Sequence, residues 1–574
     1  MDTKWTEAVS SMMKNAAETH PAFRAMDAQQ MQAMTDNFQK SLQAFAMPSA
    51  AAVKAWTDSW LAYQREMAKL WMTPVSGIEP SRDVRFKADE WASGIYPFLR
   101  QSYELTARAM AEIADNAGLP DHEQRKFSFY TRLAADAMSP SNFLHLNPEV
   151  LKLAQETNGQ SLVEGFQNLL ADLKKGYITT TDETAFKVGE NLATTPGAVV
   201  FRNDLIELIQ YTPVTPQIRS NPIVIVPPCV NKFYIFDINE KKSMIRYLLE
   251  QGNQVFIVSW RNPGADMTDY GWDEYIEQGI FTALDVAGDI MKSDKVDLLS
   301  WCNGGSMSVA ALAIMTDAQK KKIGSATFMS SLIDFTDPGE LGVFFDQPQV
   351  DAYNTRLKTV KLAPGRDIAR AMAMLHVNES IWGFVIGNYL KGKAPTPFDI
   401  LYWNADTSNL PAKWYSTFAE DMYVKNKLRE PGGLTFLGRS VDVRNIDVPV
   451  CFVAATGDHI VPWTTSYISS HLVTGQPEFI LTTGGHVSGT VINHPAKTRH
   501  SFWTGDTTID DPQEWKDSAT KTEGSWWPHW LNWVEQASGG DTRSKPSSLG
   551  SRKYKELDAA PGTYVLEERA QDGK

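Results

Sequence analysis

One segment of the chain reads Val296-Asp297-Leu298-Leu299-Ser300-Trp301-Cys302-Asn303-Gly304-Gly305-Ser306-Met307-Ser308. Its apolar first half predicts a buried strand, and the small residues and alanines that follow predict a helix. Between them lies a tight turn of small residues around a single cysteine. The pattern therefore places Cys302 at the carboxyl end of a strand, on a turn that leads into a helix.

Such a turn is typical of the nucleophile elbow of α/β-hydrolases, whose pattern is G-x-S-x-G. In this chain Cys302 replaces the serine, and Ser300 replaces the first glycine. The alternative is a packing cysteine beside a flexible Gly-Gly pair, because buried cysteines are common in protein cores. The rest of the chain has to distinguish these two interpretations.

Two later segments supply the other residues that a hydrolase site requires. The apolar run at residues 448–455 predicts a strand and ends in Thr456-Gly457-Asp458-His459. A shorter strand at 478–481 leads into a glycine-rich loop that carries His486. The order nucleophile, acid, histidine is that of the α/β-hydrolases. We therefore predict Cys302 as nucleophile, His486 as its base and Asp458 as the acid that orients the imidazole.

Strands and helices alternate around the elbow. Apolar runs at 223–226, 255–260, 296–299 and 327–330 predict buried parallel strands, with a crossover helix at 243–251. Strands resume only at Val448, after an aromatic and proline-rich stretch too long for a simple connection. We predict an α/β-hydrolase fold, class α/β, with a cap inserted at about residues 335–446.

The length of 574 residues favours two domains. Residues 1–190 are rich in Ala, Met, Gln and Glu, and predict a mostly helical N-terminal domain. Residues 191–574 form the predicted catalytic domain. The formal charge of −13 argues against a nucleic-acid partner, which usually requires a basic face. The N-terminal residues resemble no signal peptide, and no window approaches the roughly 20 apolar residues of a membrane span.

The three cysteines are Cys229, Cys302 and Cys451. They are far apart and lack metal-ligand spacing, which favours a reducing cytosol and predicts no bound metal. Only Cys302 occupies a predicted turn after a strand. A helix start and a nearby imidazole would favour its thiolate. A thiol nucleophile suits thioester exchange, since the acyl group stays activated for a second transfer.

An oxyanion hole requires two backbone N–H donors. The residue after the nucleophile, Asn303, would supply one. The loop at 227–232 follows an early strand and would supply the other from Cys229 or Val230, since prolines have no N–H. The alternative interpretation of this loop is a rigid Pro-Pro turn with an incidental cysteine.

Several strings of the chain closely resemble the polyhydroxyalkanoate synthases. Beside the Cys302 elbow and Gly485-His486 they are SPSNF (139–143), NLATTPG (191–197), PPCVNKFYIFD (227–237), VSWRNP (258–263), NYLKG (388–392), WNAD (403–406), GDHIVPW (457–463) and WWP (526–528). The resemblance covers about residues 120–535 in order and is strongest to the class I, single-subunit type. At two positions the chain departs from the family, which commonly has glycine at 300 and a small apolar residue at 303.

The resemblance implies an acyltransferase that polymerises (R)-3-hydroxyacyl-CoA of short chain length, such as 3-hydroxybutyryl-CoA, into polyhydroxyalkanoate through an acyl-Cys302 intermediate. CoA would be released from the substrate, with no other cofactor and no metal. Asp458 would also help to activate the incoming 3-hydroxyl. The implied partners are the growing polyester and its granule surface in the cytoplasm, a second copy of the chain in a homodimer, and phasins. Two alternatives remain: a cysteine thioesterase or dienelactone-type hydrolase, and a catalytically silent granule-binding protein.

Overall fold

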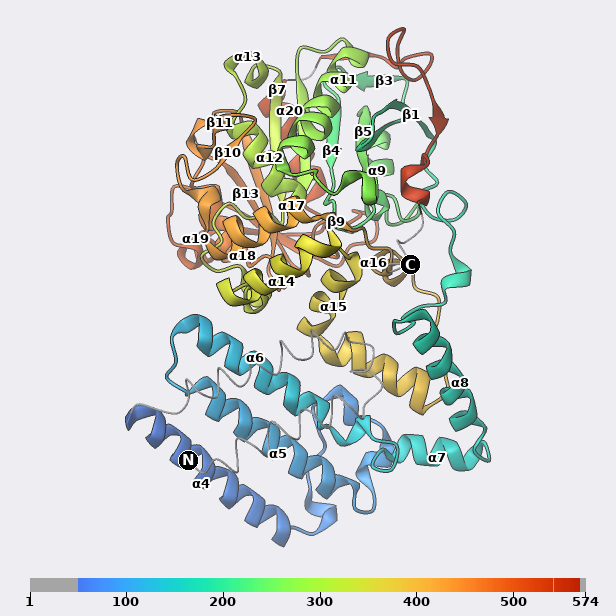
Figure 1. Ribbon diagram of the computed structural model, residues 1–574, viewed down its shortest axis with the longest axis vertical. Coiled ribbons are helices and arrows are strands. Elements are labelled where there is room, and N and C mark those ends of the chain that lie inside the picture. Colours follow the sequence, from blue (N-terminus) through green and yellow to red (C-terminus); the bar gives the residue numbers. More distant parts are fainter. Residues whose placement is uncertain (1–49, 540, 568–574) are drawn as a thin grey trace. The chain divides into compact units, whose positions relative to one another are not determined.

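The computed structural model describes residues 50–539 and 541–567. The chain forms two compact units (Figure 1). Among the described residues, one unit comprises residues 50–183 and 372–397, and the other comprises residues 184–371, 398–539 and 541–567. Residues 1–49 of the predicted helical domain lie outside the described residues. The segment 372–397 lies within the cap that the sequence predicts, but it groups with the helical unit.

The first unit is helical, and its described residues, 50–183 and 372–397, contain no strand. Its main helices are α4 Ala50–Met72, α5 Tyr96–Asp115, α6 Asp121–Ala137, α7 Pro148–Glu156 and α8 Gln160–Lys175. Helix α7 starts where the Asn147 side chain accepts the N–H of Glu149 at 3.0 Å. Helix α8 lies between Gly159 and Gly176, whose φ angles of 84° and 80° favour glycine. In the described part of the chain, no helix is both long and apolar enough to span a membrane.

The returning segment contacts α8 through the π-helical turn η11, Val385–Leu390. A side chain at Gly165 would put its Cβ 2.0 Å from the Tyr389 carbonyl oxygen, so only glycine permits this approach. Tyr389 donates its hydroxyl to Asp172 at 2.7 Å, and Asn168 donates to the Asn388 carbonyl at 3.0 Å. These contacts explain why a segment embedded in the cap sequence belongs to the helical unit.

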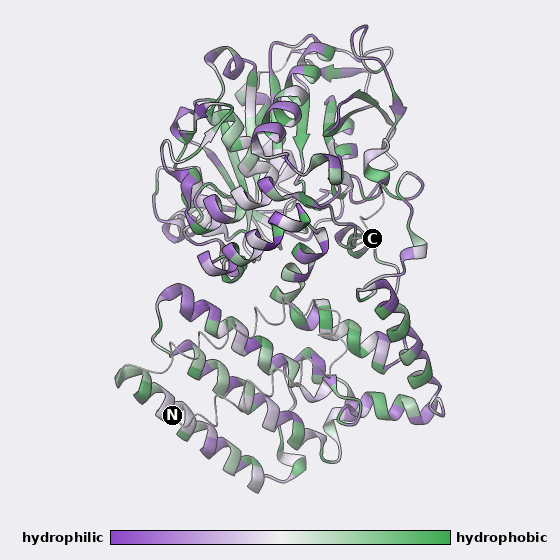
Figure 2. Ribbon diagram, in the orientation of Figure 1, coloured by the Kyte–Doolittle hydropathy of each residue, from purple (hydrophilic) through white to green (hydrophobic). Residues whose placement is uncertain are grey.

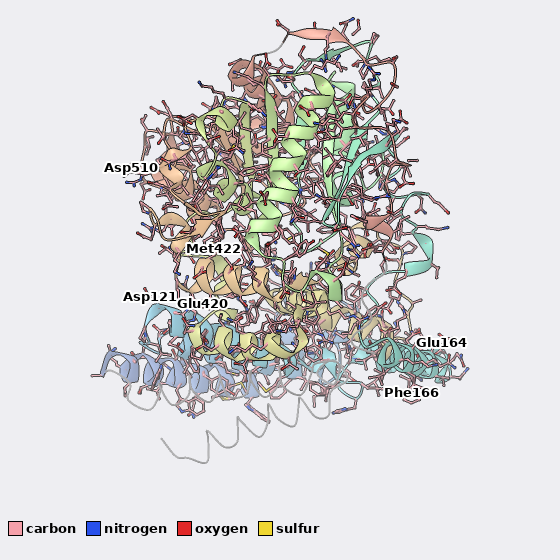
Figure 3. The ribbon with its side chains drawn as sticks, turned by 45° about the horizontal axis from the view of Figure 1, so that its top comes forward. Asp121, Glu164, Phe166, Glu420, Met422 and Asp510 are labelled. Carbon is pink, nitrogen blue, oxygen red and sulfur yellow. The ribbon has the colours of Figure 1, made fainter. Side chains whose placement is uncertain are left out.

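Another face of α8 carries exposed apolar side chains. They are Val163, Phe166, Leu170 and Leu173, with 46–59% of their surface exposed. Their spacing of three, four and three residues places them on one stripe of the helix. Figure 3 shows Phe166 with its neighbour Glu164. Exposed apolar stripes of this kind mark contact surfaces.

The second unit is built on a sheet of 11 strands in the order β15-β14-β13-β12-β7-β6-β4-β5-β2-β1-β17. Its parallel centre consists of β5 Val255–Trp260, β4 Ile223–Val226, β6 Val296–Trp301, β7 Ile323–Met329, β12 Val450–Ala455 and β13 Glu478–Thr482. The antiparallel flanks are β2 Ile206–Tyr211, β1 Gly197–Arg202 and β17 Asp558–Ala559 on one side, and β14 Ser501–Thr504 and β15 Thr520–Glu523 on the other. The predicted parallel strands all lie in this centre.

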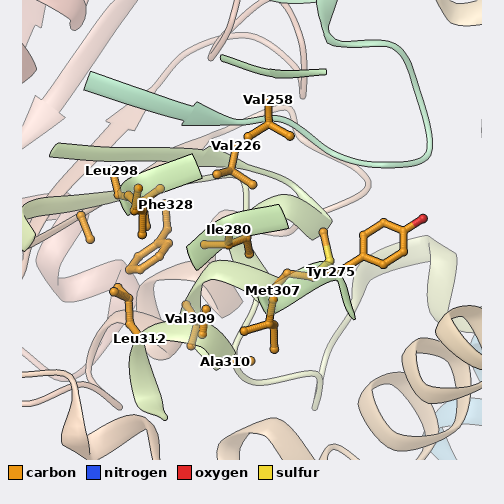
Figure 4. Close-up of a cluster of buried hydrophobic side chains, with 14 of the residues drawn as sticks. Val226, Val258, Tyr275, Ile280, Leu298, Met307, Val309, Ala310, Leu312 and Phe328 are labelled. Carbon is orange, nitrogen blue, oxygen red and sulfur yellow. The ribbon is translucent and has the colours of Figure 1, made fainter. Parts of the chain in front are cut away.

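Two hydrophobic clusters cover the two faces of the sheet. On one face, Val226, Leu298 and Phe328 pack against Met307 and its neighbours on α12, Asn303–Ala313 (Figure 4). On the other, the alternate strand residues pack with α9, Met244–Glu250, and α20, Trp527–Ser538. Because both faces are buried, the central strands are hydrophobic along their length (Figure 2). This arrangement is the α/β-hydrolase fold.

The segment between β7 and β12 forms the insertion that the sequence predicted as a cap. Its parts in this unit include α14 Gln347–Val360, α16 Asp399–Ala405, α17 Ala412–Ser416 and the π-helix η12 Thr417–Val424. Asp334, just after β7, accepts hydrogen bonds from Arg429 and Asn426, both at 2.7 Å. These bonds tie the start of the insertion to its end. On η12, Met422 is fully buried and Glu420 is partly exposed (Figure 3).

Candidate active site

The turn after β6 holds Cys302 in a strained conformation. Its φ and ψ are 55° and −130°, a region that residues with a Cβ rarely adopt. The Cys302 N–H donates to the Met329 carbonyl at 2.9 Å, and its carbonyl accepts the Gly305 N–H at 2.9 Å to start α12. The thiol is half-buried. Strand, turn and helix therefore present the sulfur at the carboxyl edge of the sheet.

The small residues of the elbow are required by close contacts. A Cβ on Gly304 would lie 2.7 Å from the carbonyl oxygens of Val226 and Pro227, and one on Gly305 would collide with Ser331. Ser300 replaces a glycine of the usual pattern without a collision. It is fully buried, and its hydroxyl donates to the Thr327 carbonyl on β7 at 3.1 Å. The extra hydroxyl is thus used to join two strands.

Asp458 and His486 lie beyond the ends of β12 and β13. The His486 Nδ1 atom is 2.7 Å from Asp458 Oδ2, and both side chains are buried. The other carboxylate oxygen accepts the N–H groups of Ile460 and Val461, each at 2.9 Å. With two N–H donors on one oxygen and the imidazole on the other, the carboxylate is fixed in orientation. Trp301 covers the His486 ring, with 5.0 Å between ring centroids.

The charges of this pair stabilise each other. Burial lowers the pKa of His486, but the Asp458 carboxylate and then the Cys302 sulfur outweigh burial and raise it to about 10. Burial acts to raise the pKa of Asp458, and the His486 charge and hydrogen bonds overcome it, so that this pKa lies below its usual range. An imidazolium at His486 is therefore stable at neutral pH.

Cys302 lies near enough to His486 for its sulfur to contribute to the raised pKa of the imidazole. The structure thus brings together three residues from three strand ends, in the order thiol, imidazole, carboxylate. This arrangement allows the imidazole to remove the thiol proton and to return a proton to a leaving group. Within the described residues of this unit, no three His, Cys, Asp or Glu side chains lie close enough together to hold a metal ion.

The predicted oxyanion loop lies beside the elbow, but one of its donors is already occupied. The Cys229 N–H donates to the side-chain Oδ1 of Asn303 at 3.1 Å. The sequence predicts this N–H as a donor to substrate, and no pattern in the sequence predicts its bond to the carboxamide. Cys229 itself is buried, and burial raises the pKa of its thiol well above the ordinary value. That thiol is therefore a poor nucleophile.

Sequence reasoning missed one side chain of the site. Tyr423, on η12 of the insertion, stacks on Phe345 with 4.1 Å between ring centroids. Burial first, and then charges that include those of Cys302 and Asp458, raise the pKa of its phenol. No motif near Tyr423 signals this placement, because only the folding of the insertion brings it to the elbow.

The sheet, the elbow and the three side chains define an α/β-hydrolase-fold protein with a thiol at the nucleophile position. Family models agree with this class. Residues 222–489 match the alpha/beta hydrolase fold, and residues 82–248 match the poly-beta-hydroxybutyrate polymerase (PhaC) N-terminus.

Curated relatives extend the match over most of the chain. A poly(3-hydroxyalkanoate) polymerase subunit PhaC of Cupriavidus necator is 40% identical over 513 residues, covering 88% of this chain and 87% of the relative. A poly(3-hydroxyalkanoate) polymerase 2 of Ectopseudomonas oleovorans is 38% identical, covering 85% and 87%. A polymerase of Methylorubrum extorquens is 36% identical, covering 92% and 87%. The chain belongs to the poly(3-hydroxyalkanoate) polymerase family.

Proposed function

We propose that this protein is an acyltransferase that polymerises (R)-3-hydroxyacyl-CoA into polyhydroxyalkanoate and releases CoA. The observation that carries the proposal is the thiol of Cys302 on the strained elbow of a polymerase-family chain, near the hydrogen-bonded His486–Asp458 pair whose pKa it affects. CoA is the leaving group of the substrate, and the proposal includes no resident cofactor or metal.

The acylation step follows from the positions of these groups. His486 takes the proton of Cys302, and the sulfur attacks the thioester carbonyl. The tetrahedral intermediate collapses with loss of the CoA thiolate, which takes the proton from the imidazolium. Asp458 holds the imidazole with Nδ1 toward the carboxylate and stabilises its positive charge. One thioester replaces another, so the acyl group keeps its activation.

Chain growth requires a second attack on the acyl-Cys302 thioester. The 3-hydroxyl of another hydroxyacyl unit attacks the carbonyl, an ester bond forms, and the Cys302 sulfur leaves. The hydroxyl proton passes to the site base, His486, with Asp458 assisting. Because this step requires a hydroxyl in place of water, the insertion that carries Tyr423 has to limit access of water to the elbow.

The proposal is tested by incubation with (R)-3-hydroxybutyryl-CoA. We expect CoA in solution and an insoluble polyester that sediments. Free 3-hydroxybutyrate without polymer would instead identify a cysteine thioesterase. Absence of CoA release, together with binding to polyester particles, would identify a silent granule-binding protein. Comparison of short-chain with medium-chain substrates then determines the acyl specificity.

The proposal extends to partners. The exposed stripe of α8, made of Val163, Phe166, Leu170 and Leu173, is suited to an apolar surface such as the polyester granule in the cytoplasm. A homodimer and phasin binding complete the proposed assembly. Sedimentation of the purified protein with and without polyester particles tests dimer formation and granule binding separately.

A further inference from the structure

The side chain of Asn303 accepts the N–H of Cys229, which is one of the two donors predicted for the oxyanion hole. Asn303 is the first residue of α12 and has 4% of its surface exposed. Its Oδ1 atom lies 3.1 Å from the Cys229 nitrogen and 3.8 Å from the Cys229 sulfur. Because a backbone N–H can only donate, the carboxamide has to present its oxygen to it. That oxygen is chemically equivalent to the carbonyl oxygen of an acyl group.

The loop that carries Cys229 does not depend on Asn303 for its position. The indole N–H of Trp260 donates to the Pro227 carbonyl at 2.9 Å. The Ser408 N–H donates to the Val230 carbonyl at 3.0 Å. The Trp403 indole N–H donates to the Lys232 carbonyl at 2.8 Å. With these three bonds the loop stays in place when the carboxamide leaves, and the Cys229 N–H is then available.

The two N–H donors predicted for the oxyanion hole therefore differ in their hydrogen bonding in the resting protein. The backbone N–H of Asn303 belongs to the first turn of α12, where helical N–H groups have no acceptor within the helix. The N–H of Cys229 is paired with the Asn303 side chain. A thioester carbonyl that is to be polarised by both N–H groups has to replace that side chain first.

We propose that the Asn303 carboxamide occludes half of the oxyanion hole in the resting protein and has to rotate away before Cys302 is acylated. The inference rests on the proposed acyl transfer and goes beyond it, since it assigns a self-inhibitory contact to a side chain that departs from the family pattern. Asn303 thereby slows acylation without taking part in proton transfer.

The test uses Asn303→Ala and Asn303→Val, which keep the backbone N–H and remove the carboxamide. Release of CoA in the first turnover with (R)-3-hydroxybutyryl-CoA is followed by rapid mixing. Because the substrate no longer displaces one hydrogen bond, we expect first-turnover acylation about fivefold faster in both variants. Asn303→Asp holds the same N–H through a charge-assisted bond, and should slow acylation at least about tenfold.

Alkylation of Cys302 by iodoacetamide is the control, because displacement at a saturated carbon forms no oxyanion. We expect the alkylation rate of the Ala and Val variants to stay within about twofold of wild type. Acylation that is unchanged or slower in both variants overturns the inference, and so does a parallel change of alkylation and acylation. Loss of alkylation in both variants would assign Asn303 a structural role instead. A wild-type protein that releases no CoA contradicts the proposed function itself, which separates the two failures.

Discussion

Strands β6 and β12 are similarly buried, but the cysteine that follows β6 and the cysteine inside β12 lie in different environments. Each has six fully buried residues and lies parallel to β7, which separates them in the sheet. Cys451 is the second residue of β12, and its burial raises the pKa of its thiol. Cys302 follows the last residue of β6 on a strained, half-buried turn. The same side chain is buried in the core inside a strand and is partly accessible on a strained turn one residue past a strand's end.

The other two predicted site residues also lie just past the ends of strands. Asp458 follows the last residue of β12 by three positions, and His486 follows the last residue of β13 by four. In open α/β sheets the carboxyl ends of parallel strands meet at one edge, where loops are free of the packing that fixes strand residues. Substitutions inside strands and just past their ends should therefore have different effects on activity.

The largest difference in activity is expected between removal of the Cys302 sulfur and removal of the Cys451 sulfur. Cys302→Ala should reduce CoA release to background, because no other group of the site can hold the acyl chain. Cys451→Ala should keep turnover within about threefold of wild type and lose about 1 kcal/mol of folding stability through a small cavity. Substrate turnover and thermal unfolding of both variants measure the contrast. Equal loss of activity in the two would refute it.

Asp458→Asn tests the acid beyond β12. Since Asp458 raises the pKa of His486 to about 10, its removal should lower that pKa and move the alkaline limb of the rate profile to lower pH. We expect turnover to fall by about 10²-fold to 10⁴-fold. The raised pKa also contributes folding stability that is fully present below about pH 6.5 and is lost as the pH rises through about 10.

The matched control is Asp447→Asn, a carboxylate before β12 with 60% of its side chain exposed and a lysine 3.4 Å away. It should leave both the rate and its pH profile unchanged. The assignment of Asp458 would be wrong if Asp458→Asn kept the wild-type alkaline limb.

A smaller effect is expected from the backbone contact behind the elbow. Gly304→Ala places a Cβ 2.7 Å from the carbonyl oxygens of Val226, at the end of β4, and Pro227, so strand and helix have to separate. We expect about 1–3 kcal/mol of destabilisation and turnover about tenfold lower. Gly288→Ala on α11, Thr282–Met291, is the control, since its Cβ would meet atoms only at 3.4 Å and beyond. A Gly304→Ala protein as active and stable as Gly288→Ala would contradict the required close approach.

The smallest effect is expected at Ser300, inside β6. Ser300→Ala removes one buried hydrogen bond to Thr327, worth about 1 kcal/mol, and leaves the turn unchanged. Turnover should stay within about twofold of wild type, as steady-state assays can measure. A tenfold loss of turnover would show that the Ser300 hydroxyl contributes to the reaction. It would contradict the expectation that residues inside strands act only through packing.

The sequence predicted the parallel centre of the sheet because those strands are short, continuous apolar runs. It did not predict the flanking strands such as β1, β2 and β15. β15 reads Thr520-Lys521-Thr522-Glu523, and all four residues are exposed and polar, so it has no hydrophobic pattern to detect. The segment 372–397 was assigned to the cap by its position in the chain alone. Its contacts with α8 depend on Gly165 and Tyr389, which are more than 200 residues apart.

Cys302, Asp458 and His486 could be proposed from the sequence because each follows a recognisable strand, and strand ends converge by topology. The contact between Asn303 and Cys229, and the approach of Tyr423 to the elbow, could not. The chain by itself thus determined which residues stand at the carboxyl edge of the sheet, because hydrophobic periodicity is local. Only the tertiary structure decided which N–H groups and rings surround the sulfur, because these contacts join loops that share no sequence pattern.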